Sequence, residues 1–388
     1  MKYDFDKLPD RLNSDSVKWH HYDEDVLPMW VADMDFKSPE LIKNAILERV
    51  KHGIFGYPVE LPELRQTIVN WVSKRHNWDI SPDDIVLMPG VIPGFNLVGH
   101  AIADPADGFL IQTPAYPPFF GMKENVNCLQ QETELPRDAA GRYGVDLDAF
   151  EAAITECTKI FDLCNPHNPT GRVFQKDELE GLAEICLRHG ITICSDEIHN
   201  DLIFSEYKHI PIASLNSDIA NNSVTLMAPS KTFNIAGLKS SFAIVTNPEL
   251  REKLLAAKKG LLGNINLFGA IAMLTAYQEC EPWLESLLEY LEANRNYMVE
   301  FINSQMPQVS VYTPEGTYLA WLNCRELDIE VTPQEFFLKE ARVGLNPGET
   351  FGKGADGFVR LNFGCPRSML TEGLERMKKA ILNKTKIA

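Results

Sequence analysis

A lysine and an aspartate each stand within four residues of the end of a short apolar run of this sequence, and together they could carry out covalent carbonyl chemistry. Lys231 follows the run Val224–Met227, and Asp196 follows the run Ile191–Ser195. A lysine amine is a nucleophile that can form a Schiff base with an aldehyde. A carboxylate beside a ring nitrogen raises the pKa of that nitrogen and keeps it protonated. These are the residue types that an aldehyde-bearing pyridine cofactor, pyridoxal 5'-phosphate (PLP), requires.

Each of the two residues has a simpler interpretation when it is taken alone. Lysine is rarely buried, so an isolated Lys231 would be a solvated surface charge. An aspartate after a strand often caps the following helix, and Asp196 could do so. Their shared position, each at the end of an apolar run, is what favours chemistry over either alternative.

Two further junctions of the same kind offer polar groups. Asn168 lies in Asn165-Pro-His-Asn-Pro-Thr-Gly, which is typical of a tight connection, but its side chain could also donate to a ring oxygen. Gly90 precedes an apolar helix whose first backbone amides, those of Val91 and Ile92, could hold a phosphate. A glycine-rich turn is equally well explained by packing, so this fourth junction is weak by itself.

The elements that must position these residues are short strands alternating with helices. Helix-like periodicity appears at Pro39–Lys51, Pro62–Asn77 and Asp177–His189. Six apolar runs bounded by turn residues are expected to be buried parallel strands: Ile85–Met88, Phe109–Gln112, Lys159–Cys164, Ile191–Ser195, Val224–Met227 and Phe242–Thr246. The alternation predicts a doubly wound α/β domain, in which the carboxyl ends of the strands form the ligand-binding edge.

After about Leu267 the pattern changes to that of a smaller α+β domain. Its expected elements are helices at Glu279–Ser304, Pro333–Val343 and Ser368–Asn383, with strands at Thr317–Asn323 and Gly357–Asn362. We therefore divide the chain into an N-terminal segment, residues 1–45, that packs with the small domain, a large cofactor-binding domain, residues 46–275, and a small C-terminal domain, residues 276–388.

Composition excludes several other classes of protein. The formal net charge of -17 repels polyanions, so nucleic acid is not an expected partner. No apolar run approaches the roughly 18 residues needed to cross a bilayer, and acidic residues near the N-terminus argue against a signal peptide, so we expect a cytoplasmic protein. The eight cysteines contain no C-x-x-C pair and are expected to be reduced thiols, with no metal site: Cys128, Cys157, Cys164, Cys186, Cys194, Cys280, Cys324 and Cys365.

The four junctions together resemble a known family. The Asn-Pro-x-Asn-Pro-Thr-Gly, Ser-Asp-Glu and Pro-Ser-Lys-Thr-Phe elements are similar to those of fold-type I PLP enzymes of the class I/II aminotransferase superfamily. The resemblance extends over nearly the whole chain. Three N-terminal stretches resemble the cystathionine β-lyase branch, also called cysteine-S-conjugate or carbon–sulfur (C–S) lyases: Val17-Lys-Trp, Pro28-Met-Trp-Val-Ala-Asp-Met-Asp-Phe and His52-Gly-Ile-Phe-Gly-Tyr-Pro.

The resemblance implies further site residues. Tyr57 should reach the PLP phosphate of a neighbouring subunit and Tyr116 should stack on the ring, so both imply a homodimer. His199 stands where many aminotransferases have the tyrosine that binds the ring oxygen, and Arg360 matches the arginine that binds the substrate carboxylate. Without the family context the tyrosines would be packing residues and Arg360 part of an ion pair.

The phosphate end departs from the broader family pattern. Position 228 is alanine where many relatives have serine, and Lys239 replaces an arginine, which keeps the positive charge but loses the fork. Ser230 and the helix amides would then contribute more. The expected cofactor-binding residues are Gly90, Val91, Ile92, Tyr116, Asn168, Asp196, His199, Ser230, Lys231 and Lys239, together with Tyr57.

The expected catalytic residues are Lys231, Asp196 and Tyr57, and the expected substrate-binding residues are Arg360, Asn168, Tyr116 and Asp35. The end of the site that holds the substrate side chain is expected to be shaped by Met34, Asp35, Tyr116 and the segment Gly263–Phe268. These assignments predict an enzyme in which the freed Lys231 amine removes the Cα proton of an amino acid.

The fate of the resulting carbanion is not decided by these residues. Expulsion of a thiolate from Cβ would give a lyase that converts L-cystathionine or other S-substituted cysteines into a thiol such as homocysteine, pyruvate and ammonia, as in methionine biosynthesis. Return of the proton to the cofactor would give an aminotransferase. A third possibility is an additional role in binding a regulatory protein. The resemblance favours the lyase.

Overall fold

The computed structural model describes residues 3–387, and its largest sheet has the order β2-β8-β7-β6-β5-β3-β4. Strands β3 to β7 run parallel to one another, and β8 is antiparallel to both of its neighbours. The strands are β2 (Ile85–Met88), β3 (Gly108–Thr113), β4 (Leu129–Glu134), β5 (Thr158–Cys164), β6 (Thr192–Asp196), β7 (Ser223–Met227) and β8 (Ser241–Ile244). The predicted doubly wound, mostly parallel α/β fold is confirmed.

Helices cover both faces of this sheet, which is why its strands read as continuous apolar runs. Helix α4 (Val91–Ile102) contacts β5, β6, β7 and β8 on one face. Helix α7 (Lys176–His189) contacts β6, and an apolar cluster that includes Phe161 and Ile193 lies beneath it on the other face. Strands buried on both faces need apolar residues at every position rather than at alternate ones.

Strand β4 was not expected from the sequence. Its residues, Leu-Gln-Gln-Glu-Thr-Glu, are mostly polar because β4 is an edge strand with one buried residue and two exposed ones. It pairs only with β3 in the sheet order. Hydrophobic periodicity cannot identify a strand that buries so little apolar surface.

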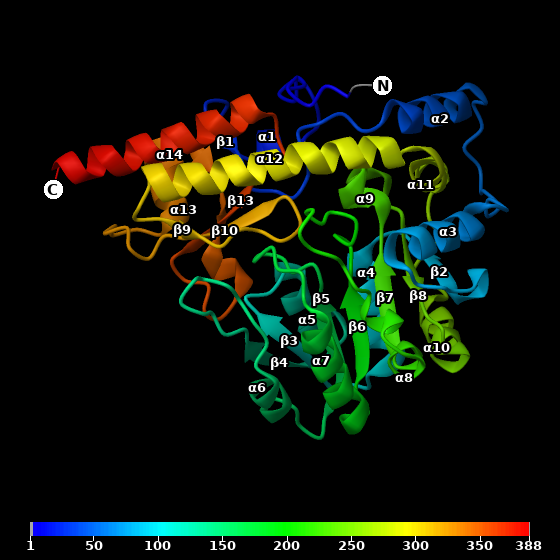
Figure 1. Cartoon of the computed structure of the whole chain (residues 1–388). Helices are drawn as coiled ribbons and strands as arrows, with labels where there is room; N and C mark the ends of the chain where they lie inside the picture. Colours follow the sequence, from blue (N-terminus) through cyan, green and yellow to red (C-terminus); the bar gives the residue numbers. More distant parts are fainter. Residues whose placement is uncertain (1–2, 388) are drawn as a thin grey trace.

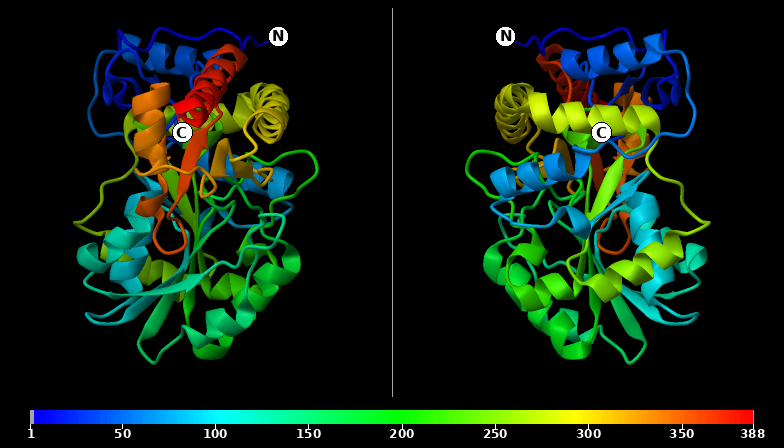
Figure 2. Two further views of the ribbon diagram at one scale, coloured as in Figure 1. Left: turned by 90° about the vertical axis from the view of Figure 1, so that its left-hand side faces the viewer. Right: turned by 90° about the vertical axis from the view of Figure 1, so that its right-hand side faces the viewer.

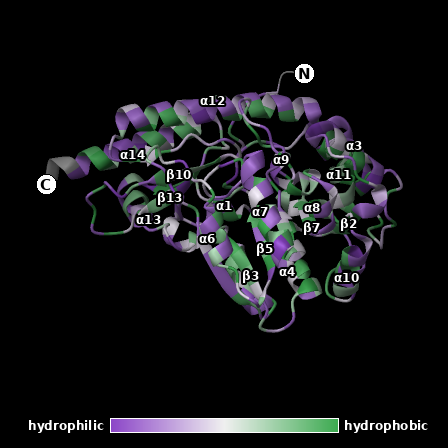
Figure 3. Ribbon diagram, turned by 60° about the horizontal axis from the view of Figure 1, so that its bottom comes forward, coloured by the Kyte–Doolittle hydropathy of each residue, from purple (hydrophilic) through white to green (hydrophobic). Residues whose placement is uncertain are grey.

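A second, antiparallel sheet has the order β12-β13-β10-β9. Its strands are β9 (Ser310–Val311), β10 (Leu319–Asn323), β12 (Asn346–Pro347) and β13 (Phe358–Asn362). Helices α12 (Glu281–Gln305) and α14 (Arg367–Ile387) contact each other and lie side by side over this part of the molecule in Figures 1 and 2. In Figure 3, α12 carries hydrophobic and hydrophilic residues in alternation, the pattern of a helix with one buried stripe.

The helix expected at Pro333–Val343 is shorter in the structure. Helix α13 (Pro333–Phe336) continues as one π-helical segment over Phe337–Ala341. Arg342 then adopts a left-handed conformation with φ 53°, which ends the helix, and Val343 begins strand β11 (Val343–Gly344). A left-handed residue at this position is a common helix ending.

The N-terminal segment crosses the second half of the molecule before the central sheet begins. After helix α1 (Val17–His20), strand β1 (Leu27–Pro28) pairs in parallel with β11. Helix α2 (Glu40–Lys51) then contacts α11 (Leu267–Glu279). Helix α3 (Leu64–His76) follows and also packs on α11.

The remaining named elements complete the connections: α5 (Met122–Asn125), α6 (Leu147–Ala152), α8 (Ser217–Asn221), α9 (Pro229–Thr232) and α10 (Pro248–Lys258). Among the helices described here, none is both long enough and apolar enough to cross a membrane. Residues 3–387 also contain no group of three or more His, Cys, Asp or Glu side chains arranged to hold a metal ion.

Candidate active site

Strands β5, β6 and β7 are neighbours and parallel, so the segments that follow them meet at one edge of the sheet. A cavity of about 350 Å³ lies at this edge. It is lined by Ala32, Pro89, Gly90, Val91, Ile92, Pro93, Tyr116, Cys164, Asn168, Asp196, Ile198, His199, Ala228, Ser230, Lys231, Ala236, Lys239 and Ser240. The structure therefore brings ten of the sequence-predicted residues to one cavity.

Lys231 reaches the cavity from α9, which begins two residues after β7. Its Nζ donates to the Ala32 carbonyl oxygen at 2.7 Å. Burial, with a further contribution from the Arg360 charge, lowers the pKa of Lys231 to about 8, while Asp33 and Asp196 oppose the shift. A substantial fraction of the amine is therefore neutral near physiological pH, as a nucleophile or base must be.

Asp196 is the last residue of β6, and its carboxyl is buried at the floor of the cavity. The backbone amide of Ile198 donates to Oδ1 at 3.1 Å. Burial raises the pKa of Asp196 to about 7, and the positive charge of Lys231 partly offsets that rise. Within residues 3–387 the carboxylate forms no ion pair, so a cationic group of a ligand would find it available.

His199 also lines the cavity and is neutral. Burial, together with the nearby charges of Lys231 and Arg360, holds the pKa of the imidazole well below its usual range. Its Nδ1 is buried and has no hydrogen-bond partner in the described part of the chain. An unpaired buried nitrogen is costly unless a ligand satisfies it.

Arg360 projects from the middle of β13 toward Asn168, which follows β5. Its Nη1 donates to Asn168 Oδ1 at 2.9 Å, and its Nη2 donates to Asn346 Oδ1 at 2.7 Å and to the Trp30 carbonyl oxygen at 3.1 Å. The guanidinium also lies 5.1 Å from the Phe351 ring centroid. Burial lowers the pKa of Arg360 to about 10, so the group stays charged at neutral pH.

Tyr116 closes one wall of the cavity. It precedes the short helical turn at Pro117–Gly121, and its ring makes an edge-on contact with Phe119 at 6.0 Å between centroids. Burial, with the negative charge of Asp196, raises the pKa of the phenol to about 12. The hydroxyl therefore stays protonated and can donate a hydrogen bond throughout the physiological pH range.

The opposite end of the cavity offers donors suited to a phosphate. Gly90 is the N-cap of α4, and the first amides of a helix, here those of Val91 and Ile92, have no partner inside the helix. Gly94 lets α4 approach the sheet, because a Cβ there would lie 2.8 Å from Met88 Sδ. Lys239 adds a cation that forms no ion pair in the described residues, and Ser230 lines the same end.

Several residues around the cavity were missed in the sequence. Ser240 lines the phosphate end, is 3% exposed, and has a hydroxyl without a hydrogen-bond partner among the described residues. Tyr318 donates its hydroxyl to the Ala32 carbonyl oxygen at 2.9 Å, next to Lys231. Asn346 orients Arg360. In the sequence, only the Ser240-Ser241 pair that follows Lys239 could have indicated Ser240. No motif indicated Tyr318 or Asn346.

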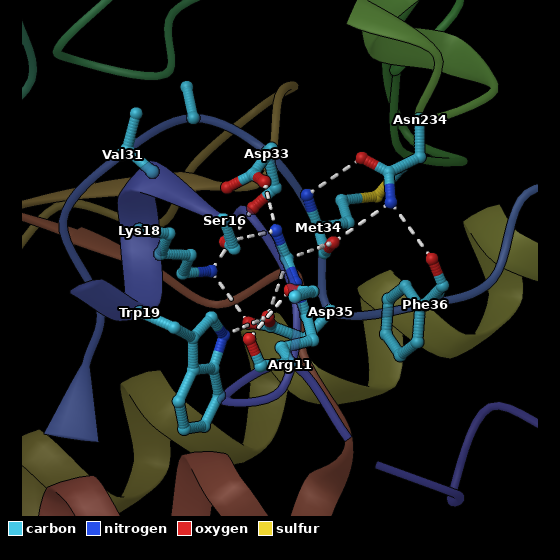
Figure 4. Close-up of polar contacts among 12 residues, drawn as sticks. Arg11, Ser16, Lys18, Trp19, Val31, Asp33, Met34, Asp35, Phe36 and Asn234 are labelled. Atoms are coloured by element: carbon cyan, nitrogen blue, oxygen red, sulfur yellow. Dashed lines mark hydrogen bonds and ion pairs between the residues drawn. The ribbon is translucent and has the colours of Figure 1, made fainter. Parts of the chain in front are cut away.

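Asp35, which was expected to bind substrate, is not among the residues that line this cavity. Its side chain is fully buried, with Oδ2 2.6 Å from Lys18 Nζ. Oδ1 accepts from Arg11 Nη1 at 2.8 Å and from Trp19 Nε1 at 2.9 Å (Figure 4). The carboxylate is thus neutralised by two cations of the N-terminal segment. Met34 and the segment Gly263–Phe268 are likewise absent from the lining.

The loop that carries Asp35 nevertheless bears on the site through its backbone. Asn234 Nδ2 donates to the carbonyl oxygens of Met34 and Phe36 at 2.8 Å each, and Asn234 Oδ1 accepts from the Met34 amide (Figure 4). Asn234 lies three residues after Lys231. The loop and the lysine segment therefore hold each other in place.

Tyr57 lies outside the cavity of its own chain. Its side chain is fully exposed, at 107% relative exposure, in the segment between α2 and α3. Ile54, Phe55 and Val59 of the same segment are also exposed. A contact between Tyr57 and a cofactor would therefore have to involve another subunit.

The cavity fits PLP. Among the described residues it offers an amine at Lys231, a carboxylate without an ion pair at Asp196 for a ring nitrogen, and an imidazole nitrogen without a hydrogen-bond partner at His199 for a ring oxygen. At the other end, free helix amides, Lys239 and the unpaired Ser240 hydroxyl would satisfy a phosphate.

Comparison with known proteins agrees with this geometry. The family model for aminotransferase class I and II matches residues 24–377. Cystathionine beta-lyase PatB of Bacillus subtilis is 40% identical over 386 residues, covering 97% of this chain and 99% of PatB. The structure of cystalysin from Treponema denticola, which contains PLP, matches with a TM-score of 0.95 and 33% identity, covering 99% of this chain and 100% of cystalysin.

A PLP-bound C–S lyase from Staphylococcus hominis matches with a TM-score of 0.92 and 34% identity, covering 98% of this chain and 99% of that one. This chain therefore resembles these proteins both in sequence and in fold over nearly its whole length. The resemblance expected from the motifs is confirmed.

Proposed function

The chain belongs to the class I and II aminotransferase family, within its cystathionine β-lyase and C–S lyase branch, and we propose that it cleaves L-cystathionine and other S-substituted cysteines. The products are a thiol, which is homocysteine from cystathionine, together with pyruvate and ammonia. PLP is the cofactor. The observation that carries the proposal is one cavity that holds the Lys231 amine and the Asp196 carboxylate, with the Arg360 guanidinium hydrogen-bonded to the lining residue Asn168.

When bound, PLP supplies an electron sink for the carbanion that forms at the substrate Cα. Asp196 would support this by holding a negative charge beside the ring nitrogen. Lys231, with its pKa lowered to about 8, takes the Cα proton at its Nζ. Arg360 binds the substrate carboxylate through the fork that Asn168 and Asn346 hold in orientation.

The choice between elimination and transamination depends on what leaves the substrate. A thiolate at Cβ is a good leaving group and departs with the electron pair of the C–S bond. The electron pair at Cα, which transamination would use to form a C–H bond on the cofactor, then forms the Cα–Cβ double bond, and water releases pyruvate and ammonia from the resulting enamine. After it has taken the Cα proton, Lys231 is an acid beside the departing group. The lysine can thus donate that proton to the sulfur, and no added keto acid is required.

The first test is to incubate the purified protein with L-cystathionine, without any keto acid, and to measure pyruvate and the visible cofactor band. We expect steady pyruvate release, and Lys231→Ala should lose both the band and turnover. Lys253→Ala, which removes an exposed lysine of α10, is the matched control and should keep both. A cofactor band with activity that appears only when 2-oxoglutarate is added would make the protein an aminotransferase.

We also propose a homodimer with shared active sites. This is supported by four exposed side chains in one short segment of the single chain. Their relative exposures are 65% for Ile54, 58% for Phe55, 107% for Tyr57 and 83% for Val59. Exposed apolar side chains gathered in one segment are typical of a contact surface. Tyr57 of one subunit would then act at the phosphate of the other.

The proposal extends to the location, the pathway and the domains of the protein. We place the protein in the cytoplasm and in methionine biosynthesis, where homocysteine is the product that matters. We divide the chain at residues 45 and 275 into the N-terminal segment, the large domain and the small domain. An additional role in binding a regulatory protein would be tested by a pull-down from the native host.

A further inference from the structure

A second carboxyl group lies within the central sheet beside Asp196, and nothing in the proposed reaction uses it. Asp162 is in the middle of β5, where its Cα pairs with that of Cys194 on β6. The next pair on the same face joins Cys164 to Asp196. Strands β5 and β6 lie side by side (Figure 1), and residues two apart on a strand share a face. Asp162 and Asp196 are therefore diagonal neighbours on one face of the sheet.

The surroundings of Asp162 offer it no counter-charge. The residue is 2% exposed, and within residues 3–387 the weakly donating Cys194 thiol is the one hydrogen-bonding group beside its carboxyl, at a geometry that does not make a full hydrogen bond. Helix α4 covers this face with an apolar cluster that includes Phe95 and Val98. The only titratable residue of α4, His100, is exposed. An ionised carboxylate in such a place would cost several kcal/mol.

The titratable groups that face Asp162 are thiols and one carboxyl, none of them basic. Cys194 contacts the carboxyl from β6, Cys164 lies on its own strand, and Cys128 is close enough for its thiol to be affected by the Asp162 charge. Asp196 is the one acid among them. Neighbouring strand β3 presents Ile111, which pairs with Asp162 and is apolar.

The two carboxyl groups differ in what could stabilise a negative charge. Asp196 accepts a hydrogen bond from the Ile198 amide and is affected by the Lys231 charge, whereas Asp162, among the described residues, has neither a backbone amide donor nor a cation and has only the weakly donating Cys194 thiol beside it. Two adjacent buried carboxyl groups cannot both ionise easily. In agreement, burial together with the Asp196 charge raises the pKa of Asp162 to about 8.

We propose that Asp162 is a positioning residue that keeps its proton within the sheet and so leaves the single negative charge of the pair on Asp196. This deepens the proposed function and rests on it, because Asp196 matters only as the partner of the cofactor's ring nitrogen. A second charge beside Asp196 would favour protonation of that residue and so weaken its hold on the protonated ring. The neutral state of Asp162 thus keeps the cofactor an effective electron sink.

The test compares wild-type protein with Asp162→Asn, whose amide is a neutral replacement for the protonated acid. Infrared difference spectra should show a protonated carboxyl in the wild type at pH 7 that is missing from Asp162→Asn. The nitrogen NMR signal of ¹⁵N-labelled PLP bound to the protein should change as the pH rises through about 8 in the wild type. In Asp162→Asn that change should be lost.

Two further variants separate this role from a merely structural one. Contact with the Cys194 thiol lowers the pKa of Asp162, so Cys194→Ala should move the change to higher pH while leaving Asp162 in place. Asp201→Asn removes another buried carboxyl with a raised pKa, outside this face of the sheet, and should leave the change where it is in the wild type. Cys194→Ala also keeps the test decisive if Asp162→Asn does not fold.

Either of two results would overturn the proposal: a wild type without a protonated carboxyl at pH 7, or the same nitrogen change in the wild type and in the Asp162 and Cys194 variants. Failure of the proposed function has a different outcome. A protein that binds PLP but releases no pyruvate from any S-substituted cysteine still gives the nitrogen signal. A protein that binds no PLP still gives the infrared answer.

Discussion

Arg360 Nη1 lies 2.9 Å from Asn168 Oδ1, which joins the second sheet to the loop after β5 across 192 positions of sequence. Asn346 holds the other guanidinium nitrogen, so the fork is fixed before any substrate arrives. A carboxylate receptor that is already oriented loses little entropy on binding. The relationship makes Arg360 the most direct place to test substrate recognition.

Arg360→Lys should raise KM far more than it lowers kcat, and kcat/KM should fall by about 30- to 100-fold, because a lysine cannot make the paired, charge-assisted bonds. Steady-state pyruvate release measures both constants. Arg325→Lys is the matched control, since Arg325 lies over the Phe358 ring at 4.7 Å, outside the cavity lining. Equal effects of the two variants would remove Arg360 from substrate binding.

The pKa of Lys231 should be visible in the rate at which the cofactor-free protein captures PLP. Only the neutral amine reacts, so the rate should increase as pH rises and level off above about 8. Arg360→Met removes a cation that lowers the pKa and should move the profile to higher pH. Asp33→Asn removes an anion that raises it and should move the profile to lower pH. Stopped-flow absorbance would follow the capture, and identical profiles would refute the electrostatic account.

Tyr57 allows a test of the shared active site by mixing inactive variants. Lys231→Ala and Tyr57→Ala should each be impaired, but a mixed dimer contains one site with both residues intact. Random exchange of subunits in equal amounts should recover about one quarter of wild-type activity for a twofold dimer. Pyruvate release after mixing measures the recovery. No recovery, despite exchange shown by size and labelling, would mean that Tyr57 acts within its own chain or not at all.

Ser240 should contribute to the phosphate end of the site. Its buried hydroxyl has no partner among residues 3–387, so Ser240→Ala should weaken PLP binding by about tenfold, the usual effect of losing one hydrogen bond to a charged group. Thr225→Val removes another buried, unpartnered hydroxyl that lies outside the cavity lining and should leave the affinity unchanged. Equilibrium titration of the cofactor-free protein distinguishes the two.

Asp35 should matter for stability rather than for substrate recognition. Asp35→Asn leaves the buried Lys18 without its partner and should lower the free energy of unfolding by about 3–5 kcal/mol. Asp23→Asn is the control, because the exposed Asp23–Arg342 pair is expected to contribute about 0–1 kcal/mol. Urea unfolding measures both. If Asp35→Asn kept its stability but lost affinity for substrate, Asp35 would be a substrate contact after all.

The amino-acid sequence by itself determined the chemistry and the main architecture of this protein. Lys231, Asp196 and Asn168 each follow a buried apolar run, and parallel strands present their carboxyl ends at one edge, so local pattern was enough to bring them together. The family branch was readable because its motifs are short and contiguous.

The tertiary structure alone decided which charged side chains form ion pairs within the protein and which remain available to a ligand. Asp35 and Asp196 are both buried aspartates, but the first is neutralised by Lys18 and Arg11 whereas the second forms no ion pair among the described residues. The isolation of Asp162 likewise depends on the register between β5 and β6 and on the apolar cover of α4. Burial and partners arise from contacts between distant segments, and these set the pKa of a group more strongly than its neighbours in sequence do.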